Sequence, residues 1–434
     1  MGNSMELKVL VISHNVFSFS SSMGKTLANF FKDFPCEDIA QLYLHTEIPT
    51  TDICKNYFRI TDFDILKKKK NVLGTRFCEE DIQKDLASER VDEGTEAQIY
   101  QFGRRRRPWM YVGRNLLWSL GKWKNDRLKE WIDEFCPDVI FFASGDYAFA
   151  YRIAMWVSRY KKIPIVTYVC DDYYFLSRKS VSPLYYLNRF DFKRTIKKLF
   201  KKHKDAVMIC DEASRDYKKE FGINTITIMT ASDLTGKPLT VRKENEKLKI
   251  SYLGNLGYNR HLALAEAGRA LVKLYGGAVL IDLYSTEKRP QITKYLTREN
   301  GIDFHGGISA DEVKRVIEKA DILMHIESMD EKNRKKVRYS VSTKIADSLA
   351  SGKCLFAYGP PEVASMQHLI RNECAIAATS PSELEETLKS AFEDGEMRKA
   401  VSQKAVETAE KYHNQERNCK IFKEILEKAV LKSE

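Results

Sequence analysis

The sequence is short of the patterns that mark several common protein classes. Its nine cysteines, among 434 residues, never form a C-x-x-C pair. Their odd number and scattered positions argue against a zinc site and against a disulfide framework. No apolar run reaches the ~18 residues of a membrane-spanning helix, and the first residues lack the charged-then-apolar form of a signal peptide. We therefore expect a cytoplasmic protein that does not span a membrane and is not exported.

Two nucleotide-binding motifs are incomplete. Gly-Lys-Thr at 24–26 ends like a phosphate-binding P-loop, but the glycine needed five residues earlier is Phe19, which does not suit the positive φ of that turn. Neither half of the chain has G-x-G-x-x-G after its first strand, and "YLGNLGYNR" at 252–260 has only two glycines three apart. These gaps argue against an ATP or GTP site and against a dinucleotide-dependent dehydrogenase.

Short apolar runs, separated by helical stretches, recur along the whole chain. Runs this apolar, without clean alternation, are typical of parallel strands buried on both faces, and their alternation with helices indicates βαβ units. The predicted strands are 8–13, 38–44, 138–143, 164–169, 206–210, 225–229, 248–253, 278–284, 302–305, 321–326, 354–358 and 374–378.

Two sets of about six strands in a chain of this length predict two doubly wound α/β domains. The break lies in the polar stretch "ASDLTGKPLTVRKEN" at 231–245. We expect an N-terminal Rossmann-like domain over 1–232, a linker over 233–247 and a second domain over 248–412. A final helix, 413–434, is expected to cross back to the N-terminal domain.

The net charge of +11 is concentrated in two segments. Residues 104–130 contain nine Lys and Arg against two acids, and residues 178–204 contain ten against Asp191 alone. These segments carry net charges of +7 and +9, which together exceed the charge of the whole chain. A local basic surface is therefore the feature to explain.

Several blocks resemble the large retaining GT4 family of glycosyltransferases. In the second half they are "YLGNLGYNRHLALAEA" at 252–267, "FHGGISADEVKRVIEKADILMHI" at 304–326 and "SVSTKIADSLASGKCLFAYGP" at 340–360; in the first half they are "CPDVIFFASGD" and "IPIVTYVCDD". The resemblance implies the GT-B fold: two Rossmann-like, doubly wound domains facing each other across a cleft, with a C-terminal helix. The N-terminal domain would bind the acceptor and the C-terminal domain the nucleotide-sugar donor.

The resemblance implies a donor site in the second half. Ser342 or Thr343 can cap a helix over 344–351, whose positive end would face a diphosphate, and Lys344 adds a cation there. The alternative is an ordinary capped helix. The donor-binding residues predicted in this way are Asn255, Arg260, Tyr284, Gly307, Ile308, Ser342, Thr343, Lys344 and Asp347.

The sequence departs from the family pattern at the donor sugar. The family's Glu-x7-Glu pair has Asp347 in place of its second Glu and Tyr339 in place of its first. Glu327 and Asp330 lie nearby but out of register. Asn255 replaces one member of the basic pair in the first donor loop, which leaves Arg260 as the other. These differences leave the identity of the sugar open.

The predicted acceptor side follows the first strands of the N-terminal half. The predicted acceptor-binding residues are Ser13, Asn15, Met23, Gly24 and Asp146. Cys170–Asp171 stands where the family has a His-Asp pair, so Asp171 is the candidate for orienting or deprotonating an acceptor hydroxyl. A retaining enzyme needs no strong base, because the leaving phosphate can take that proton. For each Asp the alternative is a loop cap.

The basic segment "RRRRPWMYVGRNLLWSLGKWKNDRLKEW" suggests a membrane contact. Its apolar residues follow steps of three or four along one face of a helix, and cations flank them, as in interfacial helices. The predicted membrane-facing residues are Arg105, Arg106, Trp109, Trp118 and Trp123. The alternatives are a helix packed on the sheet with a solvated basic rim, or nucleic-acid binding, for which no known motif is present.

Together these features predict a glycosyltransferase that moves a sugar from a UDP-sugar to a lipid-linked or polysaccharide acceptor, with retention of configuration. We expect no metal and no cofactor, no nucleic-acid partner, and a peripheral location on the inner face of the plasma membrane. The alternatives are a UDP-sugar epimerase of the same fold and a non-catalytic GT-B subunit that supports a partner transferase. The Tyr339 departure favours the non-catalytic subunit.

Overall fold

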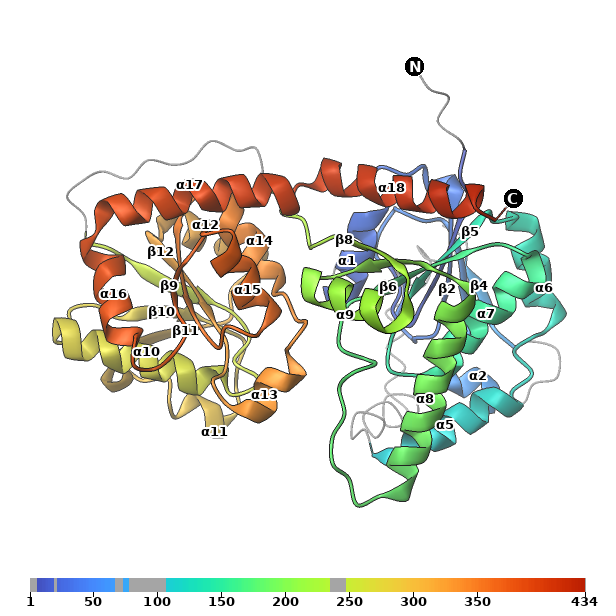
Figure 1. Cartoon of the computed structure of the whole chain (residues 1–434), viewed down its shortest axis with the longest axis horizontal. Helices are drawn as coiled ribbons and strands as arrows, with labels where there is room; N and C mark the ends of the chain where they lie inside the picture. The colour runs from blue at the N-terminus through green and yellow to red at the C-terminus, as the bar shows by residue number, and fades with distance from the viewer. Residues whose placement is uncertain (1–5, 19–21, 67–72, 78–106, 235–246, 434) are drawn as a thin grey trace. The chain divides into compact units, whose positions relative to one another are not determined.

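Two α/β units make up the chain, each built around one sheet (Figure 1). The structure is a computed structural model that describes residues 6–18, 22–66, 73–77, 107–234 and 247–433. The first unit comprises Met1–Ile209, Ala213–Ile228 and Cys419–Glu434; the second comprises Cys210–Glu212 and Met229–Asn418. Most of the predicted linker, residues 235–246, lies outside the described residues.

The first unit has an eight-stranded sheet in the order β4-β3-β2-β1-β5-β6-β7-β8. Neighbouring strands are parallel except for the antiparallel pair β3 and β4. Because β1 lies between β2 and β5, the order reverses there, which places a potential ligand crevice at the carboxyl ends of these strands. The strands are β1 (Val9–Ser13), β2 (Ile39–Tyr43), β3 (Asn56–Arg59), β4 (Thr75–Phe77), β5 (Val139–Ala143), β6 (Ile165–Val169), β7 (Asp205–Met208) and β8 (Asn224–Thr227).

Helices cover this sheet, and the last helix of the chain contributes to its core. In α18, Phe422 packs against Phe30, Phe31 and Phe141, with ring centroids 4.8 to 5.1 Å apart. The predicted return of the final segment therefore fits the assignment of Cys419–Glu434 to the first unit. The helices are α1 (Ser22–Phe30), η1 (Cys36–Asp38), α2 (Asp62–Leu66), α5 (Pro108–Leu120), α6 (Asp126–Phe135), α7 (Ala148–Lys161), α8 (Pro183–Lys202), α9 (Asp211–Phe221) and α18 (Gln415–Leu431).

The second unit has a six-stranded, fully parallel sheet in the order β11-β10-β9-β12-β13-β14. Here β9 lies between β10 and β12, so this sheet also has one point where the strand order reverses. The strands are β9 (Ile250–Leu253), β10 (Ile281–Tyr284), β11 (Ile302–Gly306), β12 (Ile322–Ile326), β13 (Cys354–Tyr358) and β14 (Ile376–Ala378).

Helices pack on both faces of the second sheet. Leu264 of α10 and Leu388 of α16 belong to the core on one face, and Leu349 of α14 and Ala409 of α17 belong to the core on the other. This double cover explains why the strands are continuous apolar runs. The helices are α10 (Arg260–Tyr275), α11 (Pro290–Thr293), η2 (Arg298–Asn300), α12 (Ala310–Lys319), α13 (Glu331–Lys336), α14 (Thr343–Ala350), α15 (Ala364–Arg371), α16 (Leu384–Glu393) and α17 (Gly395–Tyr412).

The predicted doubly wound α/β architecture is confirmed, and each of the twelve predicted strands overlaps an observed one. The structure adds two strands that the sequence did not predict, β3 and β4. Their sequences, "NYFR" and "TRF", are interrupted by polar residues and give no apolar run. β4 is also an antiparallel edge strand, a setting that needs no continuous apolar sequence.

The structure contradicts two of the residues predicted to face a membrane. Trp118 and Trp123 are only 1% and 5% exposed. Trp118 stacks on Phe149 with ring centroids 4.5 Å apart, and its indole N–H donates to Asp62 at 2.6 Å. The indole N–H of Trp123 donates to the Trp118 carbonyl at 2.8 Å. Nine residues turn a helix through about 900°, so Trp118 lies opposite Trp109 on α5, and α5 ends before Trp123.

The rest of that prediction stays a prediction. Trp109 is 48% exposed, whereas Arg105 and Arg106 lie outside the described residues. Within the described part of the chain, every helix is too short or too polar to cross a bilayer.

Buried histidines make the stability of the fold sensitive to mild acid. Burial lowers the pKa of His203 to about 4 and that of His325 to about 3. His368 and His413 form a buried pair, with their Nε2 atoms 3.2 Å apart, and burial lowers the pKa of both. Each imidazole therefore stays neutral in the folded chain at a pH at which it takes up a proton when the chain unfolds.

We expect stability to be highest above pH 6.5 and to fall as the pH drops toward 5. The unfolded histidines bind protons below about pH 6.5, and each contributes a slope of about 1.4 kcal/mol per pH unit. Thermal unfolding measured between pH 7.5 and pH 5 checks this. His203→Gln should flatten the slope, because it removes one of these buried protonation sites. A melting temperature that is constant or higher at pH 5 would contradict the prediction.

Candidate functional site

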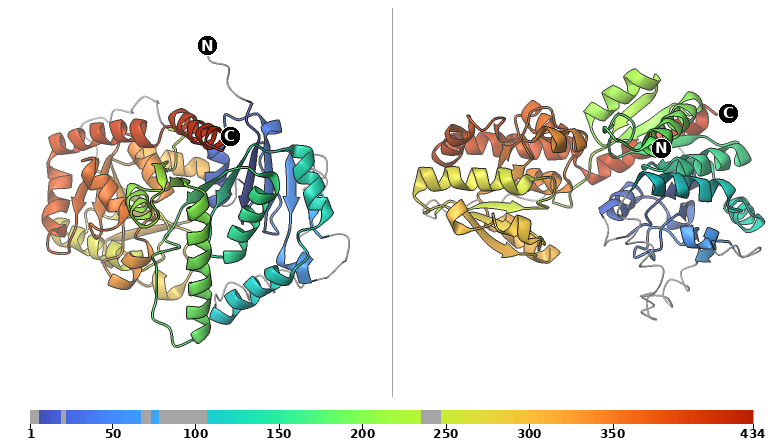
Figure 2. Two further views of the ribbon diagram at one scale, coloured as in Figure 1. Left: turned by 45° about the vertical axis from the view of Figure 1, so that its right-hand side comes forward. Right: turned by 90° about the horizontal axis from the view of Figure 1, so that it is seen from below.

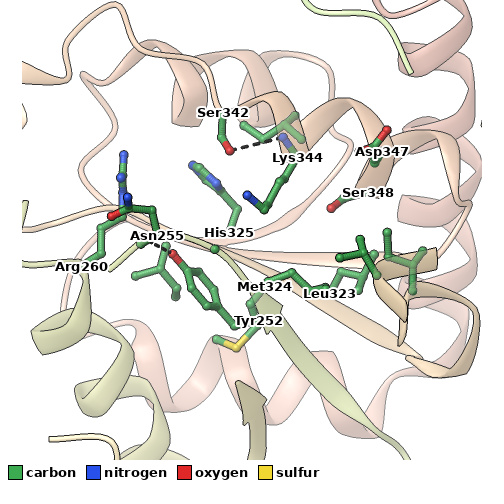
Figure 3. A pocket seen from close by; sticks show the side chains of 16 residues that line it. Tyr252, Asn255, Arg260, Leu323, Met324, His325, Ser342, Lys344, Asp347 and Ser348 are labelled. Atoms are coloured by element: carbon green, nitrogen blue, oxygen red, sulfur yellow. Dashed lines mark hydrogen bonds between the residues drawn. The ribbon is translucent and has the colours of Figure 1, made fainter. Parts of the chain in front are cut away.

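A pocket lies where the strand order of the second sheet reverses. Tyr252 and Leu253 line it from the end of β9, and His325 lines it from β12 (Figure 3). Ligands of open parallel sheets bind at the carboxyl ends of the strands at such a point. The pocket has a volume of about 90 Å³, equal to roughly three water molecules at ~30 Å³ each. It therefore encloses a small polar group, and the rest of a larger ligand would lie outside it.

Helix α14 begins at the rim of this pocket. Ser342 caps the helix, because its Oγ accepts a hydrogen bond from the Lys344 amide at 3.4 Å. Ser342 and Lys344 both line the pocket (Figure 3). The predicted N-cap is therefore present, and the positive end of the helix dipole lies at the pocket, where it favours an anion.

The charges around Lys344 also favour an anion. Partial burial of the Lys344 ammonium lowers its pKa, Asp347 opposes that effect, and the charge of Arg260 lowers the pKa further. Two cations from different helices therefore repel each other across one pocket. A bound anion would relieve both the repulsion and part of the desolvation cost.

Helix α10 brings Arg260 to the same pocket from the other side. Arg260 is the first residue of this helix, and Asn259 before it has a positive φ of 64° and no capping hydrogen bond from its side chain. The guanidinium donates to Glu327 through Nε at 3.0 Å and Nη2 at 2.9 Å. Its Nη1 has no hydrogen-bond partner among the described residues, so it can donate to a ligand.

Glu327 holds Arg260 in place. This glutamate follows β12 and is fully buried. Burial raises the pKa of Glu327, and the adjacent guanidinium acts against that rise. Burial by itself would lower the pKa of Arg260, but the charge and the hydrogen bonds of Glu327 together have the larger effect, so the pKa of Arg260 is raised. The bidentate pair therefore fixes the orientation of the guanidinium before any ligand binds.

His325 adds an uncharged polar group to the floor of the pocket. Burial and then the charge of Arg260 lower the pKa of His325 to about 3, so its imidazole is neutral at physiological pH. Its Nε2 is buried 3.6 Å from Glu327 Oε1 and makes no hydrogen bond within the described residues. In Figure 3 it lies between Arg260 and Lys344. It can exchange a hydrogen bond with a ligand oxygen.

The other predicted donor residues divide between the pocket and a separate depression. Asn255 and Asp347 line the pocket, and Asp347 accepts a hydrogen bond from Ser232 at 2.7 Å. Thr343 is the exposed first residue of α14. Tyr284 and Ile308 line a different depression. Gly307 lies beside Thr286, whose methyl group would be 2.8 Å from a Cβ at that position.

A group of possible metal ligands lies on β11, at the edge of the second sheet, and on its neighbour β10. Carboxylate and imidazole atoms of Asp282, Asp303 and His305 lie within 4.8 Å of one another. They already have protein partners, because His305 is 2.9 Å from Asp282 and Arg298 pairs with Asp303 at 2.7 Å. This cluster therefore gives no independent indication of a metal ion.

In the first unit, the predicted acceptor residues gather at the carboxyl ends of β1 and β5. The Ser13 hydroxyl donates to the Asn15 carbonyl at 2.7 Å, and the buried Gln41 donates to both residues. This network fixes the turn after β1. Asp146, in the loop after β5, accepts from the Tyr111 hydroxyl at 2.9 Å. Met23 and Gly24 lie in the first turn of α1.

The two acids after β6 have different surroundings. Asp172 is buried and accepts hydrogen bonds from the amides of Phe175 and Leu176 at 2.8 and 2.9 Å. It is therefore a loop cap, which was the alternative that the sequence allowed. Asp171 is exposed, although it accepts from the Asp172 amide at 2.8 Å. Of the two, Asp171 is the one that can reach an external hydroxyl.

Comparisons with known proteins found a family match for the second unit and matches in fold for the whole chain. Residues 243–424, nearly all within the second unit, match the family model described as glycosyl transferase-like. A comparison with curated protein sequences finds no match. Anabaena HepE in complex with UDP resembles the chain at a TM-score of 0.63 and 12% identity, covering 97% of this chain and all of HepE.

The chain has the GT-B fold. Its second unit is similar to the glycosyl transferase-like family. The fold match extends to a glycosyltransferase from Rickettsia africae, at a TM-score of 0.57 and 13% identity over 97% of this chain and 99% of the other. Sucrose-phosphate synthase from Thermosynechococcus elongatus matches at 0.59 and 10% identity over 98% and 100%. Identities this low establish the shared fold alone.

The structure also shows the surroundings of the residues at which the sequence departs from the GT4 pattern. Tyr339 is fully buried, with its hydroxyl in contact with Arg338. Asp330 caps α13, accepting from the Asn333 amide at 2.9 Å, and also accepts from Asn259 at 3.1 Å. Glu327 is therefore the acidic residue after β12 that is joined directly to a residue lining the pocket.

Sequence reasoning missed His325 as a pocket residue and the pairing of Glu327 with Arg260. A signal for the histidine was available, because it is the single polar side chain in the strand "ILMHI" and lies next to that strand's carboxyl end. The pair gave no local signal, since its members are 67 residues apart. Near the predicted acceptor residues, the Tyr147 ring stacks on Tyr111 at 5.2 Å and lies under Arg114 at 4.2 Å, which sequence reasoning also missed.

Replacing Glu327 with alanine should destabilise the protein by about 3 kcal/mol or more, because it leaves a largely buried guanidinium without its counter-ion. Chemical and thermal unfolding measure this. Glu385→Ala is the matched control: it breaks the surface pair with Lys273, whose side chains are 46% and 70% exposed, and should cost less than about 1 kcal/mol. Equal losses in the two variants would contradict the assigned role of the buried pair.

Proposed function

We propose that the chain is a GT4-type enzyme that transfers a sugar from a UDP-sugar to a lipid-linked or oligosaccharide acceptor, with retention of configuration. One observation carries the proposal: two helix N-termini and two cations, Arg260 and Lys344, surround one pocket at the switch point of the second sheet. That arrangement suits the diphosphate of a nucleotide sugar. The structures of HepE with UDP and with UDP-glucose support the choice of UDP.

In the proposed reaction, the bond between the anomeric carbon and the UDP β-phosphate oxygen breaks. A new bond forms between that carbon and an acceptor hydroxyl oxygen. Arg260 Nη1, Lys344 and the positive end of α14 stabilise the charge that develops on the leaving diphosphate. His325 hydrogen-bonds to a donor oxygen, and Asp347 binds a ribose hydroxyl. Asp171 orients the acceptor hydroxyl, whose proton passes to the departing phosphate. No metal ion is required.

UDP should raise the melting temperature of the purified protein more than other nucleoside diphosphates do. At a concentration 100 times Kd the gain is about 2.7 kcal/mol, roughly 5–10 °C for a domain of this size. Lys344→Ala removes a charge-assisted contact and should weaken UDP binding by about 10- to 100-fold. Lys389→Ala, on the exposed face of α16, is the control and should bind UDP normally.

Failure of every nucleotide and nucleotide sugar to shift the wild-type melting temperature would reject a donor site in this pocket. It would favour the non-catalytic subunit instead. Conversion of a free UDP-sugar to its epimer without an acceptor would favour the epimerase. Undiminished activity in EDTA is expected of a metal-independent transferase, and a loss restored by a divalent cation would reject that part of the proposal.

The new glycosidic bond should have the same anomeric configuration as the donor. Proton NMR of the product formed with a defined UDP-sugar and acceptor measures it through the coupling constant at the anomeric proton. Asp171→Asn should keep that configuration and retain substantial turnover, because the leaving phosphate accepts the proton. An inverted product, or activity abolished in Asp171→Asn with UDP binding intact, would instead assign Asp171 as the essential base of an inverting enzyme.

A further inference from the structure

Exposed apolar side chains are concentrated on one part of the first unit. Of the sixteen large apolar side chains that are exposed in the described residues, nine lie in α5, in α8 or in the loop that leads into α8. Single exposed apolar residues are ordinary, but a group of this kind marks an interaction surface. The nine are Trp109, Leu116, Leu120, Leu176, Val181, Leu184, Tyr186, Leu187 and Phe190.

On α5 the exposed residues form one face. Trp109, Leu116 and Leu120 are spaced by seven and four residues, which places them in line along a helix. Their exposed fractions are 48%, 56% and 75%. The core contacts of the helix come from other positions, Asn115 and Trp118, which are buried. The outer face of α5 is therefore apolar where a surface helix normally carries polar residues.

On α8 the solvent face changes from apolar to cationic along the helix. Leu187 and Phe190 are 57% and 68% exposed, and Arg194 and Lys201 continue the same line toward the C-terminus. The opposite face packs into the core through Phe192, Ile196, Leu199 and Phe200. The helix contains seven Lys and Arg but a single acid, Asp191, and that acid is paired with Arg152.

The two helices form a single surface. They pack against each other, and the Asn115 amide donates to Asn188 at 2.9 Å. The exposed Leu116 and Leu187 are the immediate neighbours of these two asparagines. Figure 1 and Figure 2 show α5 and α8 together along one margin of the first unit. We call this the α5–α8 surface: the nine exposed apolar residues with Arg107, Lys179, Arg194, Lys198, Lys201 and Lys202, all exposed.

We propose that the α5–α8 surface docks onto an anionic lipid bilayer. Exposed Leu, Phe, Trp and Tyr side chains suit the boundary of the acyl region, and adjacent Lys and Arg suit anionic headgroups. A second copy of the chain is a poorer partner, because a two-fold contact would bring this cationic helix near its equivalent. Nucleic acid is also a poorer partner, because the apolar part of the surface offers nothing to phosphates.

The inference rests on the proposed function in one respect: the purpose of docking would be to bring the enzyme to a lipid-linked acceptor. The surface consists of residues in the first unit, and the donor pocket consists of residues in the second. Lipid binding and UDP binding can therefore be measured separately in the same protein.

The test is co-sedimentation of the full chain with vesicles. One set contains equal parts phosphatidylcholine and phosphatidylglycerol, and the other contains phosphatidylcholine alone. The protein should bind the anionic vesicles, less strongly as salt rises, and should bind the neutral vesicles weakly. Leu120→Ser/Phe190→Ser should lower the partition coefficient at least tenfold. Lys198→Gln/Lys201→Gln should lower the partition coefficient about 25-fold, because each cation contributes about fivefold and the two factors multiply.

Matched controls lie elsewhere on the first unit. Leu431→Ser removes a 61% exposed leucine from α18, and Lys218→Gln/Lys219→Gln removes two exposed lysines from α9. Neither change should alter vesicle binding. Circular dichroism and the UDP-induced thermal shift should stay the same in all variants, since every substituted side chain is exposed.

The possible outcomes separate the two proposals. Absence of binding to anionic vesicles, or equal losses in the controls, would overturn the docking surface. A wild-type dimer that Leu120→Ser/Phe190→Ser converts to a monomer in analytical ultracentrifugation would also overturn it, in favour of a second copy. Vesicle binding without any UDP shift would support the surface and reject the proposed function.

Discussion

Parallel pairing of the strands in the second unit is the constraint on which its site depends. In a parallel sheet covered on both faces, the carboxyl ends of all strands lie on the same side of the sheet, and the helix that follows each strand begins there. The chain therefore delivers the start of α10 and the residue after β12 to one place, with the start of α14 beside them. The positive N-terminal ends of these helices therefore meet at the carboxyl ends of the strands as a direct result of the parallel pairing. Apolar side chains fill most of both faces of the sheet, and the polar residues of the pocket lie near the carboxyl ends of the strands.

The electrostatics of the pocket depend on one buried carboxylate. Glu327 has no exposed surface, so a counter-ion is needed to keep it charged, and Arg260 supplies it with two hydrogen bonds. The same pair fixes the guanidinium and helps to keep His325 neutral, since the charge of Arg260 lowers the pKa of that imidazole. Lys344 is the second cation at the pocket, and among the described residues it has no comparably close partner. An arrangement of this kind is organised for an anion before the anion arrives.

The first unit uses its helices differently. α5 and α8 each turn one face to the core, through residues such as Trp118 and Phe192, and both leave apolar side chains on the outside. Polar contacts of this unit also fix its loops: Gln41 holds the turn after β1, and Asp172 caps the loop after β6. Its outer surface is therefore where the chain differs most from an ordinary soluble α/β domain.

The sequence alone determined the elements whose physics is local. Continuous apolar runs located the long buried strands, and the Ser342 cap with Lys344 behind it located the start of α14, because strand burial and helix capping depend on residues close together in the chain. Tertiary structure alone decided which distant residues meet. The pairing of Arg260 with Glu327 follows from β9 and β12 lying side by side in the sheet, and the burial of Trp118 follows from the face of α5 that packs on α2 and α7. Both depend on strand order and helix rotation, which no local pattern records.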